Sequence, residues 1–97
     1  MKCLDDCHTY ALDRVGGDSD LPHVIHFYEM RKNGVKIDGV TNEDVMEVLI
    51  HRLTMLNKIL PCPENGMAID HLEVALSYLR ARTRDRVGRH VEATHKP

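Results

Sequence analysis

The stretch from Thr41 to Leu79, TNEDVMEVLIHRLTMLNKILPCPENGMAIDHLEVALSYL, decides the fold. Thr41 followed three residues later by Asp44 resembles a capping box, and acidic residues in this first turn suit the positive end of a helix dipole. Apolar residues then recur at the spacing that gives a helix one broad apolar face. They are Val45, Leu49, Leu53, Leu56 and Leu60, joined by Met46, Ile50 and Ile59.

A second helix is predicted directly after the first. Pro61-Cys62-Pro63 ends the first helix, because proline lacks the N–H donor and restricts the residue before it. The second helix is expected from near Glu64 to about Val87. Its apolar stripe consists of Ala68, Ile69, Leu72, Ala75, Leu76 and Leu79, with Tyr78 beside it. Two amphipathic helices with so short a link are expected to form an antiparallel hairpin.

The residues before Thr41 predict β-structure. His23 to Met30 and Val35 to Val40 are rich in β-branched and aromatic residues, and the Asn33-Gly34 pair between them tolerates the positive φ of a tight turn. Residues 23–40 are therefore expected to form a β-hairpin. Residues 1–22 are expected to be an N-terminal arm with a short helix over 4–15. The predicted fold is α+β and mainly α, with residues 23–97 forming one ligand-binding domain of β-hairpin and long helical hairpin.

Composition limits the class of protein. The chain has 97 residues, 42% of them hydrophobic but only 4% aromatic, which predicts one domain with a thin aliphatic core that recruits further subunits. A net charge of −2 argues against a general nucleic-acid binder. Three cysteines without an apolar leader or spanning segment predict a cytoplasmic protein with no membrane role.

Positive charge nevertheless gathers toward the C-terminal end. Arg82, Arg86 and Arg89 follow i, i+4, i+7 spacing, so one helix face would present planar cationic donors suited to phosphate oxygens, while Arg80 and Arg84 point elsewhere. The alternative is a solvated surface helix whose arginines pair with acidic side chains.

The sequence has no pattern typical of catalysis or of a metal centre. Its histidines and cysteines do not follow metal-ligand spacing, and it has no phosphate-cradling glycine loop, nucleophile elbow or HExxH motif. We therefore expect no enzymatic activity, no metal and no cofactor.

From Val24 to His95 the chain resembles small phage proteins that share a helical-hairpin domain, whose characterised members are anti-Thoeris and anti-CBASS sponges. The resemblance rests on segments in a fixed order: residues 39–45 (GVTNEDV), 50–53 (IHRL), 61–65 (PCPEN), 71–76 (HLEVAL), 82–86 (RTRDR) and 91–95 (VEATH). It implies a homo-oligomer, often a hexamer, that sequesters cyclic nucleotide messengers at subunit interfaces without degrading them. The implied ligands are glycocyclic ADP-ribose isomers and cyclic di- or trinucleotides.

The resemblance also implies which residues contact the ligand. Asn65 would bind a base or ribose edge, Arg82 and Arg86 would bind phosphates, and the arginine face would add Arg89. Met55 stands where relatives carry an aromatic residue, so a base would meet a flexible thioether there. The alternative function is a small protein- or RNA-interaction module that uses the basic C-terminal helix end.

Overall fold

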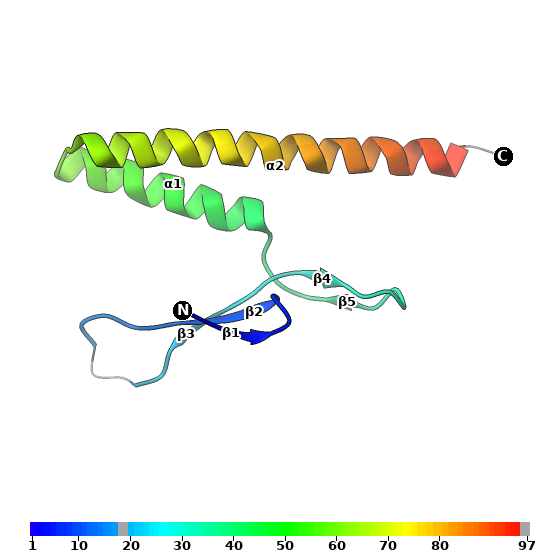
Figure 1. Ribbon diagram of the computed structural model, residues 1–97, viewed down its shortest axis with the longest axis horizontal. Coiled ribbons are helices and arrows are strands. Elements are labelled where there is room, and N and C mark those ends of the chain that lie inside the picture. Colours follow the sequence, from blue (N-terminus) through cyan, green and yellow to red (C-terminus); the bar gives the residue numbers. More distant parts are fainter. Residues whose placement is uncertain (18–19, 96–97) are drawn as a thin grey trace. The chain divides into compact units, whose positions relative to one another are not determined.

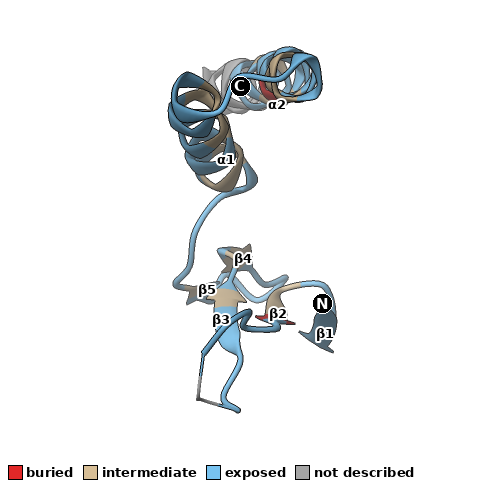
Figure 2. Cartoon of the chain, turned by 90° about the vertical axis from the view of Figure 1, so that its left-hand side faces the viewer, coloured by how far each residue is buried: buried red, intermediate tan, exposed pale blue. Residues whose placement is uncertain are grey.

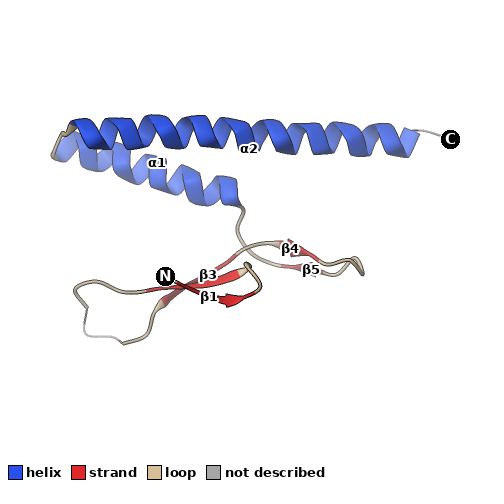
Figure 3. Cartoon of the chain, viewed as in Figure 1, coloured by secondary structure: helices blue, strands red, loops and turns tan. Residues whose placement is uncertain are grey.

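The computed structural model describes residues 1–17 and 20–95, with side chains described as far as Asp85. The chain divides into two compact units, residues 1–42 and 43–97. All the strands lie in the first unit and nearly all of both helices in the second (Figures 1 and 3). The predicted α+β class is confirmed.

The first unit contains a three-stranded antiparallel sheet in the order β1-β2-β3, built from β1 (Lys2–Asp5), β2 (Thr9–Leu12) and β3 (His23–His26). Cys3 lies opposite Tyr10 in the first pair, and Tyr10 lies opposite Ile25 in the second. The helix predicted over residues 4–15 is therefore wrong. Residues 9–12 include a β-branched and an aromatic side chain, and pairing with β3 outweighs any local helical preference.

β2 and β3 pair across the predicted boundary between residues 22 and 23. The division into an arm (1–22) and a ligand-binding domain (23–97) stays a prediction that truncation tests.

The predicted turn at Asn33-Gly34 is confirmed. It joins β4 (Glu29–Met30) to β5 (Lys36–Ile37), which pair antiparallel. Gly34 has a φ of 83°, and the Asn33 side chain accepts a hydrogen bond from the Val35 N–H at 3.0 Å. The first strand of the predicted hairpin is split, because residues 23–26 pair with β2 and only residues 29–30 pair with β5.

At Gly39 two backbone segments of the first unit, residues 39–40 and residues 26–28, lie very close together. The Val40 N–H donates to the His26 carbonyl, and the Tyr28 N–H donates to the Val40 carbonyl, each at 2.9 Å. A Cβ on Gly39 would lie 2.5 Å from the Phe27 carbonyl carbon and 2.6 Å from the Tyr28 nitrogen. A side chain at residue 39 therefore has no space unless the backbone moves.

The second unit is the predicted helical hairpin, formed by α1 (Asn42–Ile59) and α2 (Pro63–His95). The Asn57 side chain accepts a hydrogen bond from the Cys62 N–H at 3.0 Å in the link between the helices. α2 continues to His95 rather than ending near Val87. A single glycine, Gly88, costs a helix only about 1 kcal/mol and does not end it.

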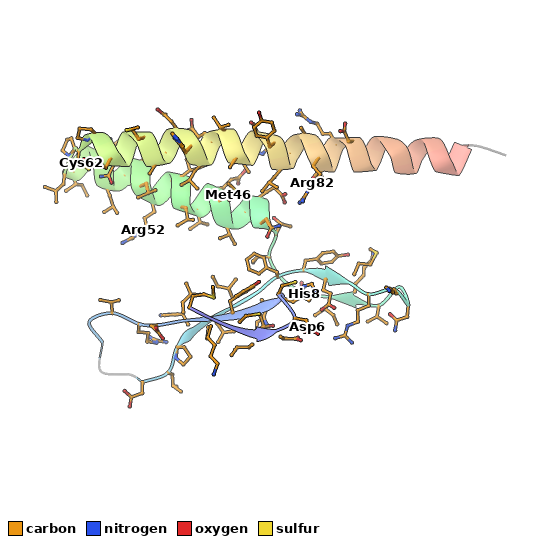
Figure 4. All side chains as sticks on the ribbon, viewed as in Figure 1. Asp6, His8, Met46, Arg52, Cys62 and Arg82 are labelled. Atoms are coloured by element: carbon orange, nitrogen blue, oxygen red, sulfur yellow. The ribbon has the colours of Figure 1, made fainter. Side chains whose placement is uncertain are left out.

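The two helices contact along half-buried stripes. On α1 the stripe is Met46, Ile50, Leu53 and Asn57, and on α2 it is Asn65, Ile69, Leu72, Leu76 and Leu79. Leu76, 5% exposed, is the most buried apolar side chain described in this unit. Figure 2 shows the exposed colouring over much of both helices, and Met46 lies between them in Figure 4.

Apolar side chains also remain on the outer faces of the hairpin. Val48, Met55 and Ile59 are exposed on α1, as are Met67, Val74 and Tyr78 on α2, and each set follows i, i+7, i+11 spacing. Within the described residues, no helix is long and apolar enough to cross a membrane.

Candidate functional site

Met55 lies on the outer face of α1, where its side chain is 45% exposed. It lines an open hollow of about 670 Å³ in which cationic, acidic and apolar side chains meet. The lining residues are Asp44, Glu47, Val48, His51, Arg52, Met55 and Leu56. Arg52 projects from the side of α1 that faces away from α2 (Figure 4). A single helix thus forms this hollow, which is largely apolar and has a guanidinium group among its lining side chains.

Asn65 and Arg82 lie far apart on the same helix. Asn65 is half-buried in the first turn of α2, and Arg82 is exposed farther along it. Their separation of seventeen residues corresponds to about 25 Å at the α-helical rise of 1.5 Å per residue. One small ligand therefore cannot contact Asn65 and Arg82 of the same chain.

The helix that carries the predicted arginine face is continuous. Because α2 extends to His95, Arg82, Arg86 and Arg89 lie on one helical segment at positions that share a face. The side chains of Arg86 and Arg89 lie outside the described residues.

Arg80 and Arg84 line a different surface, a groove of about 650 Å³ between α1 and α2. Its floor includes Ile50 and Leu76, and its other lining residues are Glu47, His51, Thr54, Glu73, Ser77, Arg80 and Arg84. Arg80 Nη2 forms an ion pair with Glu47 Oε1, with both side chains about half exposed. Such an exposed pair contributes about 0–1 kcal/mol.

Sequence reasoning missed this groove. The signal was present in the i, i+4 spacing of Arg80 and Arg84 on the same side as Leu76, the residue that packs most deeply. Glu47 and His51 line both the groove and the hollow beside Met55.

The first unit contains a third hollow, of about 490 Å³, on its three-stranded sheet. Three of the four aromatic residues of the chain, Tyr10, Phe27 and Tyr28, line it. The rings of Tyr10 and Phe27 meet edge to face with centroids 5.8 Å apart. Partial burial raises the pKa of the Tyr10 hydroxyl, and Cys3 and Cys7 add to that shift. Tyr10 thus stays a neutral donor over the physiological pH range.

Among the residues that the structure describes, no group of three or more His, Cys, Asp or Glu side chains is placed to hold a metal ion.

The sequence has a relative among known proteins. No protein-family model matches the chain. Over 60 residues, 61% of the chain, the sequence is 47% identical to "Thoeris anti-defense 1" of Bacillus phage SBSphiJ7. This chain is a homologue of a phage anti-Thoeris protein. The resemblance to anti-Thoeris proteins that the sequence predicted is confirmed. The match spans 42% of the length of that phage protein, less than half of it.

Proposed function

We propose that this protein is a phage-type sponge that binds cyclic nucleotide immune signals without degrading them, so that host anti-phage effectors are not activated. The observation that carries the proposal is the 47% identity to a phage anti-Thoeris protein. The signals are glycocyclic ADP-ribose molecules of the Thoeris response, or cyclic oligonucleotides of the CBASS response.

The ligand contacts that we propose are Met55, Asn65, Arg82, Arg86 and Arg89. A base would lie against the Met55 thioether, and the Asn65 amide would donate to and accept from a base or ribose edge. The guanidinium groups of the arginines would bind the phosphates, because a guanidinium can donate two parallel hydrogen bonds to phosphate oxygens.

The distance between these contacts supports a homo-oligomer, and a hexamer is the assembly that we propose. Because Asn65 and Arg82 of one chain are about 25 Å apart, a pocket that uses both must take Asn65 from one copy and Arg82 from another. The exposed stripe of Val48, Met55 and Ile59 supports the same conclusion, since fully burying one such side chain stabilises an assembly by about 1.5–3 kcal/mol.

The experiment measures thermal stability of the purified protein against a panel of glycocyclic ADP-ribose isomers and cyclic di- and trinucleotides. A ligand at a hundredfold excess over its Kd adds about 2.7 kcal/mol of stability. We expect a clear shift with one ligand, and recovery of that ligand intact after the protein is boiled. Recovery of a converted product would show an enzyme instead.

Arg82→Ala is the decisive variant, and Arg84→Ala is its matched control on the same helix. We expect Arg82→Ala to lose the shift while the oligomer stays folded, and Arg84→Ala to keep it. If no ligand produces a shift, and an RNA or an acidic protein binds with a steep dependence on salt, the interaction-module function replaces the sponge.

A further inference from the structure

Two cysteines meet at the turn between β1 and β2. Cys3 lies in β1 and Cys7 in the turn that follows, and the Cys7 backbone N–H donates a hydrogen bond to Cys3 Sγ at 3.3 Å. The His8 N–H donates to the Asp5 carbonyl at 2.6 Å, which closes the turn. Asp6 and Cys7 have φ values of 29° and 65°, so two consecutive non-glycine residues hold a backbone conformation that brings residue 7 back over residue 3.

This turn brings the Cys3 sulfur close to the backbone of Cys7. The N–Cα bond is about 1.5 Å long, so Cys3 Sγ lies within about 4.8 Å of the Cys7 Cα. Closure of a disulfide requires the side chains of both cysteines to rotate. Both cysteines are exposed, so a dissolved thiol reagent reaches them. The pairing of Cys3 with Tyr10 in β2 fixes the backbone at Cys3.

The geometry points to a thiol-modification site, in which Cys3 and Cys7 exchange with a low-molecular-weight disulfide such as glutathione disulfide and close to an intramolecular disulfide. The thiolate of one cysteine attacks glutathione disulfide, which forms a protein–glutathione mixed disulfide and releases one glutathione. The second cysteine, as thiolate, attacks the protein sulfur of that mixed disulfide and displaces the second glutathione. Two electrons and two protons pass from the cysteine pair to the reagent, which leaves as two glutathione molecules.

Cys62 is an internal control for this chemistry. It is also exposed, but it lies between two prolines and is the only cysteine of residues 43–97. It reacts with the same reagent and has no second thiol within its own unit to complete the exchange. Cys62 is therefore expected to stop at the mixed disulfide.

The experiment treats the full-length folded protein with excess glutathione disulfide, blocks free thiols with N-ethylmaleimide, and maps the peptides by mass spectrometry. We expect the peptide with Cys3 and Cys7 to lose two hydrogens and carry no adduct, and Cys62 to carry one glutathione. In Cys3→Ser or Cys7→Ser, the remaining cysteine of the pair should retain a glutathione. Glutathione on both Cys3 and Cys7, or a disulfide between either and Cys62, would overturn the proposal.

A rate comparison shows whether the folded turn is responsible. Closure of the mixed disulfide should be at least about tenfold faster in the folded protein than in urea, because the turn holds the two residues together in advance. Equal rates would mean that the short sequence separation alone closes the bond, and the site would lose its structural basis.

Discussion

Replacement of Gly39 by alanine is the sharpest test of the backbone approach in the first unit. An added Cβ would lie 2.5 Å from the Phe27 carbonyl carbon, and ordinary contact requires about 3.4 Å, so the backbone has to move by about 0.9 Å. Because the nearest atoms are all backbone, no side chain can turn aside to make room. The shift separates residues 39–40 from residues 26–28.

The energetic cost follows from two hydrogen bonds. The bonds from Val40 N–H to the His26 carbonyl and from Tyr28 N–H to the Val40 carbonyl are each worth about 0.5–1.5 kcal/mol, and both weaken when the strands separate. Alanine lowers the entropy of the unfolded chain, which offsets about 0.4–1 kcal/mol. We expect a net loss on the order of 1 kcal/mol, and at most about 2.6 kcal/mol.

Amide hydrogen exchange is the appropriate assay, because the two units need not unfold together and exchange reports each one separately. Gly39→Ala should lower protection in residues 23–40 and leave α1 and α2 nearly unchanged. Gly66→Ala is the matched control: it lies in α2 with open space at its Cβ, and it should stabilise the helix by about 0.5–1 kcal/mol. If Gly39→Ala behaves as Gly66→Ala does, the close approach at residue 39 is not real.

Three further outcomes are expected. Met55→Phe should tighten ligand capture by about 0.5–1.5 kcal/mol, because a flat ring stacks on a base better than a thioether does, and titration calorimetry that shows unchanged affinity would remove Met55 from the site. Deletion of residues 1–20 should leave the helical circular dichroism and cooperative melting of the hairpin, and a molten product would contradict this. Glu47→Gln should change the free energy of unfolding, measured by urea titration, by less than about 1 kcal/mol, because its ion pair with Arg80 is exposed. A larger loss would show that the ion pair contributes substantially to the stability of the hairpin.

Local signals in the sequence predicted the helical hairpin and one turn. These signals act within a few residues of their own position. α1 begins beside the capping residues that follow Val40, it ends before the prolines at 61 and 63, and the turn lies at Asn33-Gly34. The helix predicted over residues 4–15 is wrong because residues 9–12 pair with β3, which is distant in the sequence. The apolar stripe of the second helix stops at Leu79, so it carries no signal for the end of α2 at His95.

The candidate site could be predicted only in part. Helical periodicity assigned the arginines to two different faces of the helix. Arg80 and Arg84 line the groove, which agrees with their assignment to a face other than that of Arg82, Arg86 and Arg89. The groove itself depends on which side of α1 packs against Leu76. That choice is made by tertiary packing, because both sides of α1 carry enough apolar residues to do so.

If the proposed pocket uses Asn65 of one copy and Arg82 of another, their wide spacing makes ligand binding depend on the protein's own concentration. If a complete pocket needs two copies, the number of pockets in a dilute solution rises with the square of the protein concentration, and in a concentrated solution it rises linearly. Capture would then begin above a threshold of expression. Below that threshold the chain would be present but unable to remove its ligand, so the level of synthesis would determine when a signal is silenced.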